Sequence, residues 1–423
     1  MNREFLTKTL GPGLLFAGAA VGVSHFVQST RAGAVFGLGL LLIIIAANVI
    51  KYPAFSFGPR YAAATGTSLL EGYRRQGTWA LVVYALVTLA TMFTVQAAVT
   101  LVTAAILAAL LDAKMSPDNL WWISLALMAF CAALLGVGKY RWLDRIIKVV
   151  VPALTILTVI ATVLVIPRIK WSSMAVVPSS ADWKLHLMFI APLVGWMPSA
   201  IDISVWHSLW TLAKRNDADH APSIRESLLD FKIGYIGTAC LAVCFLLLGA
   251  GVLHGSGKPA PAGAVGFAVT VLNLYTETLG EWSRYLIGGC AVMVMFSTTL
   301  TVVDGFPRAL SALAARFQRP EEPGEDVVAK PNPLLYWLFA GIIAIGSLII
   351  LKYYLKRFKE LVDLATTISF FTAPVLAYLN HRAVTSPEIP ADHRPSPGMI
   401  TFSLACIGLL SLLAAWWLYV RFL

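Results

Sequence analysis

Short groups of residues that include polar side chains interrupt two long apolar stretches of this chain, at places where a helix is expected to continue. The first group is Gly22, Val23, Ser24 and His25, of which Ser24 and His25 are polar. A rise of about 1.5 Å per residue places His25 roughly 16 Å beyond Leu14, near the centre of a hydrocarbon layer about 30 Å thick. An ionisable side chain at that depth costs free energy, so its presence indicates a functional site.

The second group lies inside the apolar stretch 186–213 and consists of Val194, Met197, Ser199 and Asp202. Pro198 removes a backbone donor and disfavours helical geometry at Met197, so we expect the helix to break there. Ser199 and Asp202 form an S-x-x-D pattern that is close to a capping box. Asp202 therefore either complements a helix N-terminus or, as the only carboxylate of the stretch, binds a cation.

Side chains of the two breaks could bind one small ligand together. For a metal ion the candidate ligands are His25, Met197 and Asp202, helped by backbone carbonyls near Gly22 and Val194. Imidazole and thioether ligands suit later transition metals, although a single carboxylate compensates a divalent charge poorly. Alternatively, His25 is an interior histidine bonded to a neighbouring carbonyl.

A proton could use the same region. His25, Asp202 and His207 are the candidates, because imidazole titrates near physiological pH and His207 lies close to the second break. His207 could instead be an interfacial residue beside Trp206 and Trp210.

The composition places these groups in a membrane protein. Of 423 residues, 58% are hydrophobic and 13% are charged, and the mean hydropathy is +0.76. Such values lie outside the range of soluble domains. A net charge of +10 then reports basic cytoplasmic loops and not nucleic-acid binding. We expect the protein to hold no resident cofactor. We also expect it not to be an enzyme, because the sequence shows no set of nucleophile, base and orienting group.

Eleven apolar runs are long enough, or nearly so, to cross a bilayer. They cover 12–36, 38–57, 79–111, 120–138, 144–167, 186–213, 229–253, 281–303, 334–352, 360–381 and 397–421. The distribution of Lys and Arg in the connections predicts a cytoplasmic N-terminus in the plasma (inner) membrane. The basic connection 352–359 is an exception on the outer side. Lys51 is expected to snorkel from the inner end of its span, and Asp304 to mark the end of the eighth span.

The two breaks fall in the first and sixth runs, which are the corresponding members of two five-helix halves. Paired interruptions of this kind indicate a secondary transporter with inverted repeats and a site near the membrane midplane. The sequence therefore predicts an all-α membrane fold in one domain, 1–423. Its parts are a first repeat at 11–168, an inverted second repeat at 186–383 and an eleventh helix at 396–421.

Several motifs of the chain resemble those of a known transporter family. Gly-Pro-Gly at 11–13, Arg-Ala-Gly-Ala at 31–34, the R-x-x-x-x-T-G pattern at 60–66 and Met197-Pro198 resemble the Nramp metal-ion transporters (natural resistance-associated macrophage protein). The resemblance implies the LeuT-like fold of the amino acid, polyamine and organocation superfamily, with two inverted five-helix repeats and an eleventh helix, and transport by alternating access.

The chain also departs from that family. Family members carry D-P-G-N in the first break, where this chain has Gly22 to His25, so both first-helix metal ligands are replaced. The sixth-helix methionine matches Met197, but the small residue three before it is Val194 and the motif histidine is Ser199. No Asp or Glu lies between Glu71 and Asp112, where the family has acidic residues for proton passage.

Three functions remain open from the sequence. The first is uptake of a divalent transition-metal cation, with protons as a possible coupling ion. The second is transport of another small solute, such as an organic cation, an amine or an amino acid, with Trp196 and Trp206 offering aromatic faces. The third is a membrane sensor that does not transport. The partners expected are the lipid bilayer and a small solute or ion, with no nucleic acid, and the sequence does not set the oligomeric state.

Overall fold

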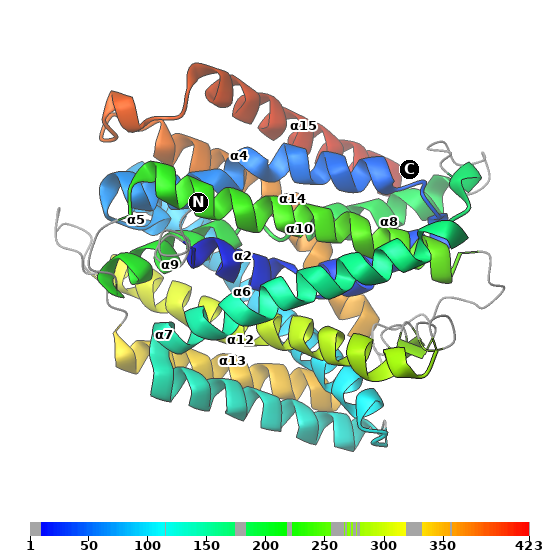
Figure 1. Ribbon diagram of the computed structural model, residues 1–423. Coiled ribbons are helices and arrows are strands. Elements are labelled where there is room, and N and C mark those ends of the chain that lie inside the picture. Colours follow the sequence, from blue (N-terminus) through cyan, green and yellow to red (C-terminus); the bar gives the residue numbers. More distant parts are fainter. Residues whose placement is uncertain are drawn as a thin grey trace.

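The computed structural model describes residues 10–422, apart from 115, 174–182, 218–221, most of 255–279, 319–331 and 356–357. All regular elements in the described part are helical (Figure 1). The longer ones are α4 (Leu41–Thr65), α6 (Thr78–Leu110), α7 (Pro117–Val165), α10 (Ile224–Val252), α12 (Trp282–Gln318), α13 (Pro333–Tyr353), α14 (Phe358–Val384) and α15 (Pro397–Phe422). The shorter ones are α2 (Pro12–Ala20), η1 (Val23–Ser29), α3 (Thr30–Phe36), α5 (Leu69–Gln76), η2 (Ile166–Arg168), η3 (Trp171–Ser173), α8 (Trp183–Gly195), α9 (Ile203–Asp217) and η5 (Ala391–His393).

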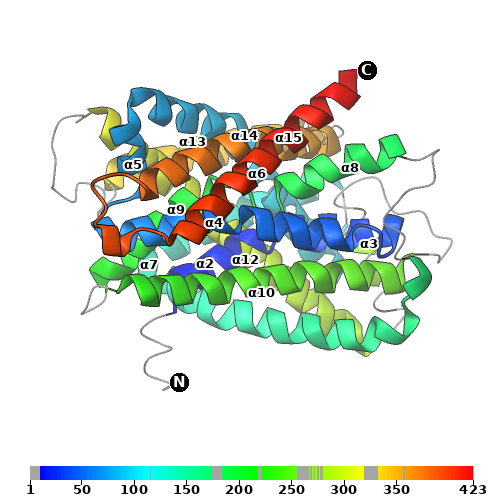
Figure 2. The same cartoon turned by 90° about the horizontal axis from the view of Figure 1, so that it is seen from above.

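Nine helical stretches of the described chain are long and apolar enough to cross a membrane. Two of them, Pro117–Gly138 and Arg141–Arg168, lie in α7, the second running on into η2. Figure 1 shows α7 as two runs, one along the lower edge of the bundle and one that crosses it toward the right. Viewed from above, the long helices run between the same two ends of the molecule (Figure 2). We call the end that contains α5 the α5 end; α2 begins and α4 ends there. The chain is therefore an integral membrane protein.

The eighth predicted span is longer than expected. Asp304 was expected to end it, but α12 continues to Gln318. The Asp304 carboxylate is buried, and it accepts hydrogen bonds from Trp210 Nε1 at 2.8 Å, Arg308 Nη2 at 2.7 Å and Tyr336 Oη at 3.0 Å. A carboxylate with this many partners can stay inside a helix, so the prediction was wrong at this point.

The first predicted interruption is present, but it covers two residues and not the four from Gly22 to His25. Helix α2 ends at Ala20, Val21 and Gly22 leave helical geometry, and the chain resumes as the π-helical η1 at Val23. Two hydroxyls bond the freed carbonyls: Ser24 Oγ donates to Ala20 O at 2.7 Å, and Thr298 Oγ1 lies 2.8 Å from Gly18 O. Ser24 and His25 thus begin the next helical segment and do not lie in the gap itself.

The second interruption is as predicted at Pro198 and extends further. Helix α8 ends at Gly195 and α9 begins at Ile203, so residues 196–202 are not helical. Asp202 directly precedes α9, at the position of an N-cap. Both predicted breaks are therefore present, and each divides one membrane path into two pieces.

Small residues let α10 approach both pieces of the first interrupted path. A methyl group at Gly234 would lie 2.0 Å from Gly13 O, and one at Gly249 would lie 2.0 Å from Thr30 O. Contacts this short have no room for a side chain, so the backbones touch, as small residues allow between membrane helices. Helix α10 therefore holds α2 and α3 at once.

Helix α4 approaches the second interrupted path in the same way. A methyl group at Gly58 would lie 2.3 Å from Ser204 O in α9. The two interrupted paths thus each have one long partner helix.

Candidate functional site

A cavity lies between the two interrupted paths. Its polar lining side chains are Ser24, Thr91, Ser199, Asp202, Thr298 and Ser369. Its volume is about 40 Å³, measured as the space open to the centres of water molecules. One water needs roughly 10–15 Å³ on this measure, so the cavity has room for about three waters or a small, partly hydrated ion.

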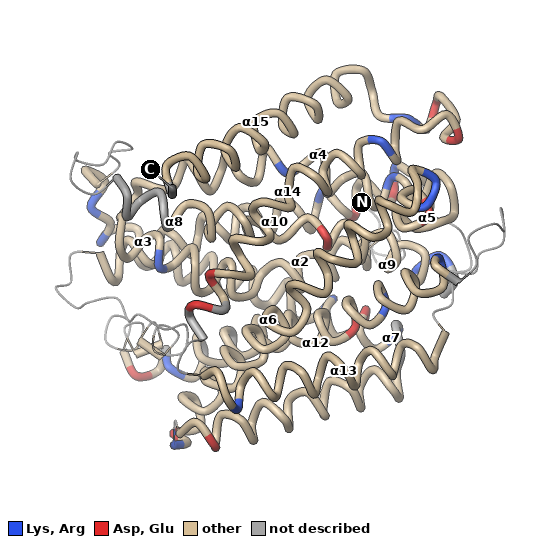
Figure 3. Tube along the Cα trace, turned by 180° about the vertical axis from the view of Figure 1, so that it is seen from behind, with Lys and Arg blue, Asp and Glu red and all other residues tan. Residues whose placement is uncertain are grey.

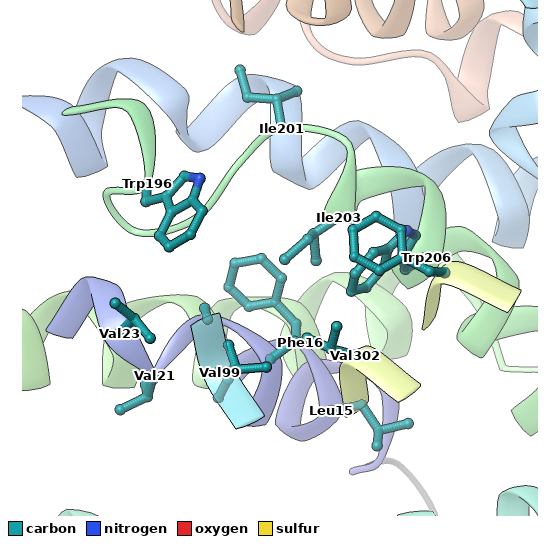
Figure 4. Close-up of a cluster of buried hydrophobic side chains, with 14 of the residues drawn as sticks. Leu15, Phe16, Val21, Val23, Val99, Trp196, Ile201, Ile203, Trp206 and Val302 are labelled. Atoms are coloured by element: carbon teal, nitrogen blue, oxygen red, sulfur yellow. The ribbon is translucent and has the colours of Figure 1, made fainter. Parts of the chain in front are cut away.

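Two tryptophans of the second path border this cavity. Trp196 and Trp206 reach toward the first path, where Figure 4 shows Val23 and Phe16 on the side that faces them. The Trp196 indole donates to Ser369 Oγ at 3.1 Å, which fixes the ring. The cavity therefore has apolar, aromatic walls with a few polar groups between them.

Asp202 is the carboxylate of this cavity. The residue is 5% exposed, and its Oδ1 atom has no hydrogen-bond partner in the described part of the chain. A buried carboxylate oxygen without a donor is costly. It is therefore suited to a cation, a water or a proton that enters the cavity.

The sequence-predicted residues divide into two sets. Val23, Ser24, Ser199 and Asp202 line the cavity, as predicted for a ligand site. Gly22, His25, Val194, Met197 and His207 do not line it. Met197 is fully buried in a different apolar cluster, with Val194. The predicted metal ligands are therefore not gathered around one point in this conformation.

His25 is engaged at both ring nitrogens. Its Nδ1 lies 2.7 Å from Ser24 Oγ, and its Nε2 lies 3.1 Å from Thr238 O in α10. The side chain is fully buried. His25 thus joins the first break to α10, and binding a metal would require it to give up one of these bonds.

His207 is also fully buried, but it has no polar partner. Its ring stacks on Phe16 with centroids 5.8 Å apart and lies 5.6 Å from the ring of Phe231. Neither ring nitrogen is bonded within the described chain. His207 therefore lies in an aromatic environment away from any interface.

Lys51 is the site residue that sequence analysis misplaced. Its side chain is fully buried, and Nζ donates to Val194 O at 2.6 Å, Gly195 O at 2.9 Å and Ser199 O at 3.1 Å. The snorkelling prediction was wrong because the span was ended at residue 57, whereas α4 continues to Thr65 and places Lys51 near its middle. The signal in the sequence is the continuation of the helix past residue 57, which makes Lys51 a mid-span residue.

Asp230 holds the start of the first path and was not singled out from the sequence. Its Oδ1 accepts from Gly11 N at 3.1 Å and its Oδ2 from Gly13 N at 2.7 Å. The first backbone donors of a helix have no partner within it, so this carboxylate caps α2 from α10.

Removal of this cap is expected to loosen α2. Loss of an N-cap costs about 0.5–2 kcal/mol, so in an Asp230→Ala variant the amides of Gly11 and Gly13 should exchange with deuterium about 2-fold to 30-fold faster. Asp118→Ala removes an exposed acidic residue from another helix start and is the matched control. Equal exchange at Gly11 and Gly13 in the wild type and the Asp230→Ala variant would contradict the capping role.

A charged cluster ties down α5 at its end of the bundle. Glu71 pairs with Arg74 Nη2 at 2.6 Å, Arg75 Nε at 3.0 Å and Arg316 Nη1 at 2.9 Å. Burial of Glu71 favours its neutral form, but the three arginines outweigh this and the pKa of its carboxyl is lowered. The cluster joins α5 to α12 through an ionised carboxylate.

The chemistry available at the cavity is cation binding without a preformed metal cluster. The described residues contain no group of three or more His, Cys, Asp or Glu side chains that could hold a metal ion. What the cavity offers is one carboxylate, three serine and two threonine hydroxyls, and space for water. Such oxygen ligands suit hard cations.

Comparisons with known proteins agree with this architecture. A family model described as natural resistance-associated macrophage protein-like (Nramp) matches residues 13–420. An uncharacterised protein of Pasteurella multocida (strain Pm70) is 37% identical over 407 residues, covering 95% of this chain and 89% of that protein.

Solved structures show a shared fold at low identity. A mutant of the Eremococcus coleocola manganese transporter has a TM-score of 0.66 at 13% identity, covering 97% of this chain and 85% of that one. MhsT in complex with L-phenylalanine has a TM-score of 0.68 at 12% identity, covering 96% and 97%. The same fold thus accompanies proteins whose bound or transported molecules differ widely.

Proposed function

Because the chain belongs to the Nramp family, it is a membrane transporter and not an enzyme, and we propose that it carries a metal cation by alternating access. The observation that carries the proposal is the Asp202 carboxylate, which has one unbonded oxygen and lines a cavity between two interrupted helical paths. Interrupted helices near the midplane are where secondary transporters bind their cargo.

The proposal includes two inverted five-helix repeats, 11–168 and 186–383, followed by an eleventh helix at 396–421. The support for these repeats is that the two halves are arranged alike. The first membrane path of each half is interrupted. The interrupted path of the first half packs against α10, the second helix of the second half, and that of the second half packs against α4, the second helix of the first half.

We also place the α5 end on the cytoplasmic side, with the N-terminus, in the plasma (inner) membrane. Figure 3 shows basic residues gathered around α5. Arg74, Arg75 and Arg316 meet there, and basic residues are concentrated on the cytoplasmic side of membrane proteins.

The cargo proposed is a hard divalent cation of the Mn²⁺ or Mg²⁺ type. Asp202, Ser24 and Ser199 supply oxygen ligands, and the space left beside the ion holds about two waters. A softer transition metal would need His25 and Met197, which point elsewhere in this conformation. Oxygen ligands and retained water are typical of Mg²⁺ and Mn²⁺ sites.

Uptake into liposomes tests this function. Purified full-length protein should take up Mn²⁺ along its gradient, and external Mg²⁺ should compete more strongly than Zn²⁺. A dye for internal pH reports coupling: acidification with uptake would support symport of protons through Asp202, and a constant pH would exclude it. Absence of uptake or competition for every metal tested would refute metal transport.

A second candidate cargo is a small organic cation. The specific observation in its favour is the buried Lys51 ammonium beside the second break, which opposes a dication. The faces of Trp196 and Trp206 could contact an alkylammonium ion instead. Uptake of methylammonium that Mn²⁺ does not inhibit would favour this cargo over a metal.

A further inference from the structure

Three backbone carbonyl oxygens meet at a single point beside the second break. Two belong to Val194 and Gly195 at the end of α8, the third belongs to Ser199 within the break, and together they are called here the carbonyl cage. The last carbonyls of a helix lack partners within it and carry the negative end of its dipole. The break at residues 196–202 leaves only one bond to this set from the main chain of the described residues, from Met197 N to Val194 O at 3.2 Å, so this point attracts a positive charge.

The Lys51 ammonium occupies that point. Its three hydrogen bonds, of 2.6, 2.9 and 3.1 Å, use all three donors of an ammonium group. Asp202 attracts the Lys51 ammonium, but from beyond ion-pair distance, and no carboxylate of the described chain contacts it directly. Carbonyl dipoles therefore supply the direct partners that a fully buried charge requires.

A lysine in the middle of an apolar membrane helix costs free energy, so its presence indicates a role that an apolar residue cannot fill. Capping the broken end of α8 is such a role. The same carbonyls would otherwise be open to ions from the cavity beside them, because Ser199 contributes to both the cage and the cavity lining.

We propose that the carbonyl cage is a monovalent-cation site that the chain fills with its own Lys51 ammonium, and that this resident charge keeps free cations away from these oxygens. A cage of neutral oxygens suits a monovalent ion of ammonium or potassium type better than a divalent one, which demands anionic ligands. The cage does not depend on the cargo proposed above. Its effect on cargo selection does rest on that function.

Chemical complementation tests the cage without any transport assay. The Lys51→Ala variant of the full-length protein in detergent is expected to melt about 5 °C or more below the wild type. Ethylammonium or K⁺ at constant ionic strength should restore at least half of that loss, whereas the bulky N-methylglucammonium ion should not. Mn²⁺ should restore less than K⁺.

Three variants serve as controls. Lys51→Met fills the space without a charge and should be as destabilised as Lys51→Ala but insensitive to ethylammonium and K⁺. Lys232→Ala removes an exposed lysine and should melt like the wild type in every salt. If Lys51→Ala does not accumulate, Lys51→Arg must melt above Lys51→Met, because only the arginine keeps a cation in the cage.

The proposal is overturned if Lys51→Ala melts like the wild type, if no small cation restores it more than N-methylglucammonium, or if Lys51→Met equals Lys51→Arg. These melting curves can be read even if liposomes containing the wild type transport no metal. Failure of the cage and failure of the proposed function are therefore separate results.

Discussion

Liposomes that contain an Asp202→Asn variant are expected to take up Mn²⁺ at least about 30-fold more slowly than liposomes with the wild type. Asp202 is the carboxylate of the cavity, and truncating one partner of a buried charge pair costs about 2–5 kcal/mol. A loss of about 2 kcal/mol already corresponds to about 30-fold. The amide keeps the shape of the side chain, so the fold should be retained.

The matched control is Asp392→Asn, which neutralises an exposed carboxylate in η5. This variant should transport like the wild type. Both variants should elute as the wild type does in size-exclusion chromatography, so that lost uptake is not lost protein. Undiminished Mn²⁺ uptake by Asp202→Asn would remove Asp202 from the cargo site.

The second large effect is expected from one methyl group at Gly234. An alanine there would place Cβ 2.0 Å from Gly13 O, so α10 and α2 would have to separate. Overpacking costs typically 1–3 kcal/mol, and more where backbone must move. We expect a loss of at least about 3 kcal/mol, seen as a lower melting temperature in detergent and a smaller monodisperse yield.

Gly237→Ala is the control on the same helix, one turn away. A methyl group at Gly237 meets nothing within 4 Å, and replacing glycine by alanine favours a helix by about 1 kcal/mol. The two variants should therefore shift the melting temperature in opposite directions. Equal shifts would contradict the backbone contact between α2 and α10.

The sequence predicted the two interruptions because their causes are local. Pro198 prevents a regular helix at the preceding residue, and Gly22 stands among polar residues at the depth of the membrane centre. The structure confirms both breaks. It also confirms the all-helical class in the described chain, and the family match confirms the resemblance.

The composition of the cavity could not be predicted because it depends on how helices rotate. Ser24 and His25 are neighbours in sequence, yet Ser24 lines the cavity and His25 bonds to Thr238 on the opposite side. Asp230 lies more than two hundred residues from the α2 amides that it caps. Only tertiary packing brings such groups together, and no periodicity in the sequence reports it.

Errors at helix ends had larger consequences than errors of helix type. The predicted second span ended at residue 57, whereas α4 continues through Pro59, and prolines are tolerated in membrane helices where neighbouring groups satisfy the freed carbonyls. With the true end at Thr65, Lys51 becomes a mid-helix residue. The predicted end of the eighth span at Asp304 was wrong because the partners of this carboxylate in α9 and α13 are distant in sequence.

The contacts of α10 have a mechanical consequence. Its backbone touches both α2 and α3. The two pieces of the first interrupted path are therefore coupled through α10, and neither can move far without the other unless one of these contacts is lost. Motion that opens the cavity by way of α2 must therefore either carry α10 along or break the Asp230 cap and the contact at Gly234. Rocking of a whole helical bundle would leave both the Asp230 cap and the Gly234 contact intact. These contacts therefore favour movement of α2 and α10 together as one rigid body.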